Sequence, residues 1–521
     1  MTQAREQLKQ FRQSLYTLFN QRQDALFNLI DANTSFGHRC RSIVELSCAP
    51  CFHRKYSSIT DAIADGACQV DWSRVSQLIQ DSHQTPQQPT MRKFIIDCTP
   101  NPRPFAKTLA ERVVTHAPNP APGNKPIAVG HQYSALVELP CDTLSHKKHW
   151  VVPMHVQRVK QAEKGNEVGL QQLIDHLKQN KLTDELVLSI GDSLYGTEAC
   201  RTIAGQQDNL IHLFRLNSQR NIFLPPDNDD TTASVGRKKV FGQKLSLSKL
   251  DAFPNSDQPA TTTWVSAKGQ HYQVQIECWN DVLLRGSRKF RSEKHPINLL
   301  KITVTDEQGQ QLFKRPLMLG VSGRRRSELS LIDAFNSYHD RYDIEHFFRF
   351  GKQKLLMDAY QTPSVEHEEA WWWICLISYH QLYLARLLTQ ATPRPWEKYL
   401  PAYQQAQEGT VTPTQAQRGF ANLLETIGSP AKLCVPRGRL SGRVLGSTQE
   451  KRPQQDILFK AKKAAKKPLA NDLDRIISML EKSAKNSSIE KIDDLVGLVK
   501  KLLNTTHFNI EQLIEMLNNS S

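Results

Sequence analysis

Apolar residues recur at helical spacing through the first part of the chain. Between Phe11 and Ala32 several of them lie near helical spacing, which predicts helical structure: Leu15, Leu18, Phe19, Ala25, Leu26 and Leu29. Ser57–Ile63 has the composition of a capped helix start. The stretch His83–Pro89 is rich in Gln and Pro and is typical of a linker. The pattern therefore predicts a helical region over residues 1–88.

The pattern changes at Met91, after which short apolar runs alternate with helical segments. Runs typical of buried strands occupy Phe94–Ile96, Ile127–Leu139, Trp150–Val159, Leu186–Ile190 and Leu210–Leu216. Helical patterns occupy Glu167–Gln179 and Thr197–Ala204. The order strand, strand, strand, helix, strand, helix, strand over residues 89–216 predicts an α/β fold with a ribonuclease-H-like mixed sheet.

A β-rich insertion is predicted over residues 217–322. It opens with a polar stretch rich in Pro and Asp, Pro225–Asp230, which breaks the preceding α/β order. Strand-like runs then follow at Thr262–Val265, Tyr272–Ile276 and Leu299–Val304, with turn residues between them.

Helical patterns return after residue 322. One helix is predicted from Ser327 to about Leu356, and an apolar helix from Ala370 to Leu388. The three consecutive tryptophans Trp371–Trp373 of the second helix are predicted to pack in the core. Asn471–Ser521 carries an apolar stripe at helical spacing, which predicts a helical tail that packs on another surface or chain.

The charge of the chain favours an anionic partner. It has 521 residues with 67 Lys and Arg against 52 Asp and Glu, a formal net charge of +15. Nucleic acid is the commonest partner of so basic a protein. The segment Lys432–Lys467 alone has eleven basic residues against two acids. No run of about 18 apolar residues occurs and the N-terminus has no apolar signal core, so we expect a cytoplasmic protein without a membrane partner.

The ten cysteines are scattered, as is typical of free thiols in a reducing compartment. Cys48 and Cys51 have the spacing of zinc ligands, with Cys40 nearby. The remaining spacing matches no common zinc finger, so structural thiols are the favoured interpretation and a zinc knuckle is the alternative.

Three acidic residues stand out. Asp97 and Asp192 each follow a predicted buried strand, where a carboxylate can project into a cleft from a rigid base. The third, Glu345, lies in the pattern Tyr338-x2-Arg341-x3-Glu345-x6-Lys352. At about 100° per residue these four side chains share a helix arc of about 60°. The alternative is a solvated charged face in which Arg341 simply pairs with Glu345 four residues later.

Three carboxylates suit phosphoryl transfer. They can hold two divalent ions about 3.5–4 Å apart, one beside the attacking oxygen and one beside the leaving oxygen. Mg²⁺ prefers such hard oxygen ligands, and Mn²⁺ is expected to substitute. Because bare carboxylates repel a polyanion, Arg341 and Lys352 are suited to bind the phosphates.

The segment Tyr338–Lys352 resembles the Tyr-Arg-Glu-Lys signature of bacterial DDE transposases of the insertion-sequence-family-4 type. Ile95–Pro100 and Gly191–Gly196 look like that family's first and second acidic motifs, and the β-rich insertion lies between the second Asp and the Glu, as in the family. The likeness runs from about Arg92 to Gln361. Leu46–Phe52 also resembles a large transposase subgroup.

The resemblance implies a DNA transposase that cleaves transposon ends and joins them to target DNA. Asp97, Asp192 and Glu345 would form the catalytic, metal-binding triad. Tyr338, Arg341 and Lys352 would contact the inverted-repeat end near the scissile phosphate, and an aromatic residue of the insertion, Trp264 or Trp279, would stack on a flipped base. A homodimer in the synaptic complex and association with the bacterial nucleoid are also implied.

Six regions are expected along the chain. They are a helical DNA-binding or platform domain (1–88), the first part of the core (89–216), the β-rich insertion (217–322), the completion of the core (323–430), a basic linker (431–468) and a helical tail (469–521). Two other functions stay open: a catalytically inactive, domesticated DNA-binding regulator, and a nuclease without strand transfer.

Overall fold

The structure is a computed structural model. It describes residues 2–83, 91–116, 125–142, 145, 148–226, 239–266, 269–287, 290–389, 396, 399, 411–434, 444–448 and 450–459. The predicted tail Asn471–Ser521, the lysines Lys460–Lys467 and most of the predicted linker His83–Pro89 lie outside these residues. The boundaries of the six expected regions remain predictions.

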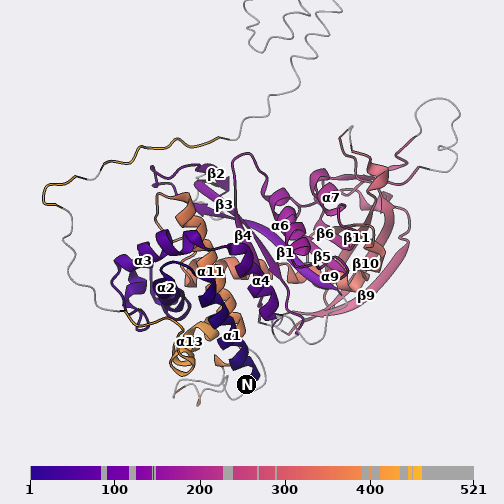
Figure 1. The fold of residues 1–521 in the computed structure, drawn as a ribbon. Helices are drawn as coiled ribbons and strands as arrows, with labels where there is room; N and C mark the ends of the chain where they lie inside the picture. Colours follow the sequence, from indigo (N-terminus) through magenta and orange to yellow (C-terminus); the bar gives the residue numbers. More distant parts are fainter. Residues whose placement is uncertain are drawn as a thin grey trace, which may run out of the picture. The chain divides into compact units, whose positions relative to one another are not determined.

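The N-terminal region is helical. Its elements are α1 (Thr2–Leu18), α2 (Gln23–Phe36), the 3₁₀ turns Gly37–Arg39 and Ile43–Cys48, α3 (Ser57–Asp61), the π-helical turn Ala62–Gly66, the 3₁₀ turn Ala67–Gln69 and α4 (Trp72–His83). Helices α1 and α2 pack on the long helix α11 (Val365–Ala385), and α13 (Pro413–Ile427) packs on both α2 and α11 (Figure 1). Because α11 is enclosed on all sides, its three tryptophans are buried, at 0%, 0% and 5% exposure, which confirms their predicted core packing.

A ten-stranded mixed sheet forms the centre of the described part of the chain. Its strands are β1 (Arg92–Pro102), β2 (Val113–His116), β3 (Ile127–Glu138), β4 (Val152–Val159), β5 (Val187–Gly191), β6 (Leu210–Arg215), β9 (Gln258–Val265), β10 (His271–Val282), β11 (Ile297–Thr305) and β12 (Leu317–Ser322). Strand β3 pairs antiparallel with β1 and β4, whereas β1, β5 and β6 are parallel. Helix α6 (Gly165–Gln179) connects β4 to β5, and helix α7 (Glu198–Ala204) connects β5 to β6. The predicted ribonuclease-H-like α/β core is confirmed.

The strands of the β-rich segment extend this same sheet. Strand β12 pairs antiparallel with β6, and β11, β10 and β9 follow in order toward the far edge. Two short strands, β7 (Asn221–Phe223) and β8 (Lys244–Ser246), form a separate pair, and 3₁₀ turns lie at Leu250–Ala252, Ser292–Lys294 and Arg326–Glu328. The continuous sheet carries helix α9 (Leu331–Asp340) against β6, β9 and β10 (Figure 1).

Two local predictions are wrong in detail. Strand β1 continues through Asp97 to Pro102, because its far half still pairs with β3 after its pairing with β5 ends at Ile95. The single helix predicted from Ser327 to Leu356 is two helices, α9 and α10 (Asp343–Lys354), that join at Arg341 and Tyr342. At this joint the amides of Arg341, Tyr342 and Glu345 bond to carbonyls three residues back, so the turn tightens and the helix axis is interrupted.

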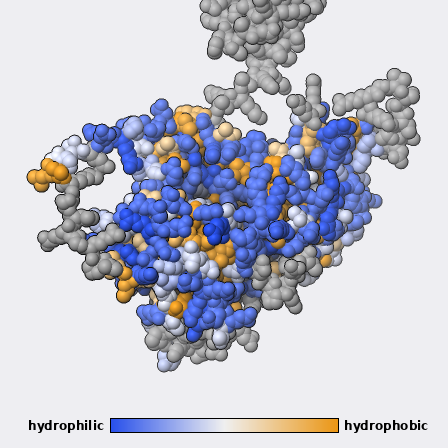
Figure 2. All heavy atoms as spheres, viewed as in Figure 1, coloured by the Kyte–Doolittle hydropathy of each residue, from blue (hydrophilic) through white to orange (hydrophobic). Residues whose placement is uncertain are grey.

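The last described segment lies along the edge of the sheet. The amide of Leu458 donates to the carbonyl of Arg112 (2.8 Å), and Leu458 bridges Val113 of the edge strand β2. The face shown in Figure 2 is mostly hydrophilic with small apolar patches between, as expected for a chain whose apolar residues fill the core. Among the described residues, no helix is long and apolar enough to cross a membrane.

Candidate active site

Asp97 and Asp192 occupy matched positions on neighbouring parallel strands. Ile95 of β1 pairs with Ile190 of β5, and each aspartate lies two residues beyond its member of that pair. Because side chains two residues apart project from the same face of extended chain, the register brings the two carboxylates to one edge of the sheet. Asp97 Oδ1 accepts a hydrogen bond from the amide of Cys98, and Asp192 Oδ1 accepts one from the amide of Leu194, both at 2.8 Å.

Gly191 allows the turn that carries Asp192. A Cβ atom at this position would lie 2.5 Å from the ring of Tyr195, which is buried against it. The glycine therefore lets Tyr195 fold back under the strand end, and its phenol reaches the thiol of Cys98 beside Asp97 (3.9 Å). The buried ring of Tyr195 therefore packs next to Gly191, which precedes Asp192, and next to Cys98, which follows Asp97.

Glu345 reaches this edge from α10, about 150 residues later in the chain. The guanidinium of Arg341 joins it to the sheet: Nη2 donates to Glu345 Oε1 at 3.0 Å, and Nη1 lies 3.6 Å from Asp97 Oδ2. The side chains of Asp97, Arg341 and Glu345 are 21%, 16% and 38% exposed, so the group is open to solvent on one side. The predicted pairing of Arg341 with Glu345 is present, and the arginine also contacts the first aspartate.

Asp192 and Glu345 both lie close enough to Asp97 to influence its carboxyl group. Burial raises the pKa of Asp97 to about 7, and the negative charges of Asp192 and Glu345 add to the rise. The charge of Arg341 and the amide of Cys98 act in the opposite direction. One arginine thus opposes the mutual repulsion of three acids, and the site favours additional cations.

Tyr338 and Lys352 border the same edge. The guanidinium carbon of Arg341 lies over the ring of Tyr338, 5.8 Å from the ring centroid. Burial raises the pKa of the Tyr338 phenol, and the charge of Asp192 contributes to this rise. Lys352 Nζ donates to Thr99 Oγ1 (2.8 Å) and to the carbonyl of Pro100 (2.7 Å), so it fastens α10 to β1 just beyond Asp97.

The two candidate stacking residues have different surroundings. Trp264 lies on the outermost strand, β9, and is partly exposed. Its ring lies 5.1 Å from that of His339, the neighbour of Tyr338. Trp279 is 4% exposed, and its Nε1 donates to the carbonyl of Pro254. Only Trp264 therefore contacts the signature segment.

Sequence reasoning missed two contacts that support the carboxylates. Asn166 of α6 donates to the carbonyl of Leu194 (2.6 Å), within the turn that carries Asp192. The ring of His149 contacts Asp343 (Nδ1 to Oδ1, 2.6 Å) in the first turn of α10, two residues before Glu345. Neither residue belongs to a motif, so the sequence carried no signal for either.

The donor set fits divalent metal ions. Carboxylates offer the hard oxygen atoms that such ions prefer, and the pKa of Asp97, which burial raises to about 7, is raised further by the charges of Asp192 and Glu345. Among the described residues, no three His, Cys, Asp or Glu side chains are already arranged as ligands of one ion. Asp97, Asp192 and Glu345 are the candidate residues for a divalent metal ion at this site.

The cysteines near the N-terminus differ in exposure and in hydrogen-bond partners. Cys40 is buried and its thiol lies 3.7 Å from the carbonyl of Phe36, whereas Cys51 lies beside Ser35 and Cys48 is exposed. Burial raises the pKa values of Cys40 and Cys51 to about 11, which keeps both thiols protonated. All three are free thiols in the described structure.

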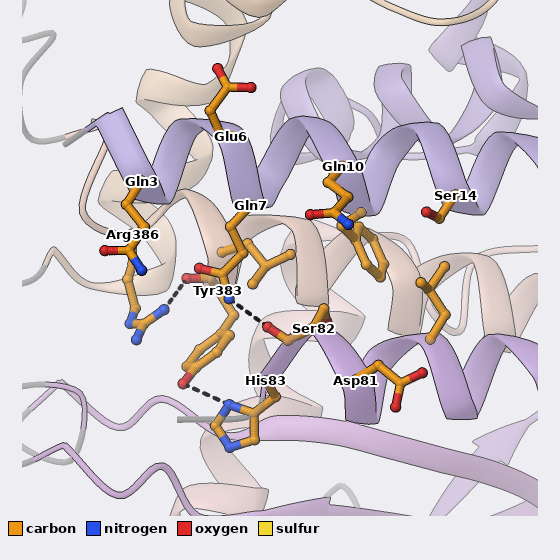
Figure 3. Close-up of a pocket in the computed structure, with 13 residues that line it drawn as sticks. Gln3, Glu6, Gln7, Gln10, Ser14, Asp81, Ser82, His83, Tyr383 and Arg386 are labelled. Carbon is orange, nitrogen blue, oxygen red and sulfur yellow. Dashed lines mark hydrogen bonds between the residues drawn. The ribbon is translucent and has the colours of Figure 1, made fainter. Parts of the chain in front are cut away.

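A groove of about 560 Å³ lies elsewhere, between α1, α4 and the end of α11 (Figure 3). Its polar walls bond across the helices: Gln7 donates to the carbonyl of Ser82, and Tyr383 contacts His83. None of the three carboxylates lines it. We attribute the groove to helix packing.

Comparison with known proteins identifies the family. No curated protein matches the chain. A family profile described as DDE superfamily endonuclease matches residues 14–283, more than half of the chain. This range includes Asp97 and Asp192, the two aspartates that the register of β1 and β5 brings together, and it ends before Glu345. The chain therefore belongs to the DDE superfamily of endonucleases, and DNA is its substrate.

Proposed function

We propose that this protein is a DNA transposase of the insertion-sequence-family-4 type. It would cleave DNA at the ends of a transposon and join those ends to a target. The observation that carries the proposal is the double contact of Arg341, which links Glu345 on α10 to Asp97 on β1. This contact supports a site in which Glu345 of the Tyr-Arg-Glu-Lys signature acts together with Asp97 and Asp192.

Asp97, Asp192 and Glu345 are proposed as the catalytic triad and as the ligands of two Mg²⁺ ions, for which Mn²⁺ can substitute. When bound, the metal would activate the attacking water or 3′-hydroxyl and stabilise the leaving oxygen. The chain's own part is to hold the three carboxylates on a rigid base. Lys352 contributes to this by fastening α10 to β1.

Arg341 and Tyr338 are proposed to contact the phosphates of the transposon end. Arginine suits this role because its planar guanidinium offers two parallel hydrogen bonds to a phosphate. Lys352 would contribute positive charge beside the scissile phosphate. Trp264 is proposed to stack on a flipped base, since its partly exposed ring lies next to the signature segment. The burial of Trp279 favours a structural role for that residue.

The other proposed partners are target DNA and a second copy of the chain. The basic segment Lys432–Lys467 has the composition of a region that follows the DNA backbone, and a synaptic homodimer would bring two transposon ends together.

A plasmid excision assay with matched inverted-repeat ends tests the proposal against its alternatives. Transposase activity gives excision in Mg²⁺ followed by integration of the excised segment. Cleavage without integration would instead make the protein a nuclease. Binding of the ends without cleavage would make it a DNA-binding regulator that has lost catalysis.

A further inference from the structure

The guanidinium of Arg341 lies between two carboxylates of the acidic site. Its guanidinium contacts Asp97 through one terminal nitrogen and Glu345 through the other. The other signature cation, Lys352, is directed away from this pair, toward Thr99 and Pro100 of β1. Arg341 is therefore the signature cation that bridges two of the three carboxylates.

This bridge has the features of a contact that can open. The Arg341–Asp97 distance of 3.6 Å exceeds that of a hydrogen bond, and Glu345 is 38% exposed. Arg341 also lies at the joint between α9 and α10, where the backbone bonds follow the tighter 3₁₀ pattern. A side chain at such a joint, with one face toward solvent, can change partners without repacking the core.

We propose that Arg341 is a built-in counter-ion that holds Asp97 and Glu345 in the metal-free protein and exchanges with the divalent metal. The inference rests on the proposed function, because it takes both carboxylates as metal ligands. When Mn²⁺ or Mg²⁺ binds, the guanidinium releases the two acids. It is then available to a phosphate of the transposon end.

Two consequences follow for the free protein. The bridge keeps like charges from repelling one another before metal arrives, which stabilises the end of β1 against α10. It also competes with the metal, so metal affinity without DNA is lower than the three carboxylates alone would give. A phosphate that takes the guanidinium would raise metal affinity, and by linkage the metal would raise affinity for DNA to the same extent.

The test is a calorimetric titration of Mn²⁺ into the full-length, metal-stripped protein without DNA. Arg341→Gln removes the bridge and should bind Mn²⁺ about tenfold more tightly than the parent. Arg341→Lys keeps the charge, but one ammonium cannot join both acids through separate nitrogens, so affinity should rise by a smaller factor. The matched control is Arg349→Gln, on the same helix, where the arginine contacts the phenol of Tyr342. Its Mn²⁺ affinity should equal that of the parent.

The outcomes separate the inference from the proposed function. Equal Mn²⁺ affinity of the parent and Arg341→Gln would overturn the counter-ion role. A rise for Arg341→Gln with none for Arg341→Lys would reduce the effect to net charge and would also overturn it. If neither the parent nor any variant binds Mn²⁺, the metal-binding triad itself is wrong.

Thermal unfolding supplies a second readout on the same variants. In EDTA, Arg341→Gln should unfold at a lower temperature than the parent, because the acids lose their counter-ion. Saturating Mn²⁺ should then raise its unfolding temperature more than it raises that of the parent. Arg349→Gln should follow the parent under both conditions.

Discussion

Two arginines in this chain contact carboxylates in very different ways. In the helical region, Arg12 and Asp31 form a sealed pair with exposures of 2% and 0%. Both oxygens of Asp31 accept from Arg12, at 2.6 and 3.0 Å, and Gln381 also accepts from the guanidinium. At the edge of the sheet, Arg341 is shared between Asp97 and Glu345, and a third acid, Asp192, lies near.

The difference lies in charge balance and solvent access. Arg12 and Asp31 are matched one to one, so each buried charge is neutralised and hydrogen-bonded, as burial requires. The acids around Arg341 outnumber it and remain open to water, which leaves negative charge for a mobile cation. A sealed pair of this kind fixes helices in place, whereas an unbalanced group at a sheet edge can exchange partners.

The largest expected effect concerns the unbalanced acids. Asp97→Asn, Asp192→Asn and Glu345→Gln should each reduce Mg²⁺-dependent cleavage by at least about a thousandfold, since each removes a metal ligand. DNA binding should persist, because the loss of a carboxylate reduces repulsion from phosphate. Glu328→Gln, which breaks a surface pair with Arg325, is the control and should cleave normally. Near-normal cleavage by a triad variant would remove that residue from the proposed triad.

The unfolding temperature of Asp97→Asn also tests whether Asp97 differs from Asp31 in its contribution to stability. Because the pKa of Asp97 is raised to about 7, its ionised form destabilises the folded state. At pH 8 the Asp97→Asn variant should therefore unfold at the same temperature as the parent or at a higher one. A clear fall in unfolding temperature would mean that this aspartate is a structural group like Asp31.

The next effect is on the sealed pair. Arg12→Met leaves Asp31 buried without its cation and should lower the free energy of unfolding by about 3–5 kcal/mol. Denaturant unfolding followed by far-UV circular dichroism measures the change. Arg22→Met, which breaks the half-exposed pair with Asp65, should cost less than about 1 kcal/mol. Similar costs for the two variants would show that burial does not distinguish these pairs.

A smaller effect tests geometry at constant charge. Arg341→Lys keeps one positive charge but lacks the bidentate fork, so single-turnover cleavage of a bound end duplex should slow by about tenfold. Arg349→Lys on the same helix should change the rate by less than about twofold. Parental rates for both variants would mean that this helix face is only a solvated charged surface.

The smallest effect comes from buried groups that stay neutral. Burial lowers the pKa of His212 to about 4, and its ring is held by Ser189 and the carbonyl of Tyr195. The folded state therefore binds fewer protons than the unfolded chain, and stability is complete above about pH 6.5 and declines as the pH falls toward 4. His212→Gln should flatten this decline in calorimetric scans between pH 7 and 5. An equally steep decline in the variant would assign the pH dependence to other groups.

Much of the fold could be predicted because its signals are local. The strand from Val187 to Gly191 is a short, mostly apolar run, and the helix from Glu198 to Ala204 follows a threonine that caps it. Both were predicted within two residues. The alternation of strands and helices then restricted the topology to a mixed ribonuclease-H-like sheet.

The predictions were wrong where the extent of a helix or strand depends on residues that are distant in sequence. The apolar run at Phe94–Ile96 ends at Asp97, but β3 continues to supply hydrogen bonds as far as Pro102, so the strand continues. The helical pattern through Arg341 is unbroken in sequence, yet packing of α9 on β9 and of α10 on β1 accompanies an interruption between them. Periodicity carries no record of such partners.

The sequence by itself determined the order of elements, the basic character and the four signature residues, because these follow from local composition and spacing. Only the tertiary structure decided that Ile95 and Ile190 pair, that Arg341 reaches both Asp97 and Glu345, and that Asn166 and His149 support the two halves of the site. Apart from the pair Arg341–Glu345, which the spacing of the two residues already suggested, these contacts join residues from about 30 to 250 positions apart. Their formation depends on how the sheet and helices pack, which no local pattern of residues encodes.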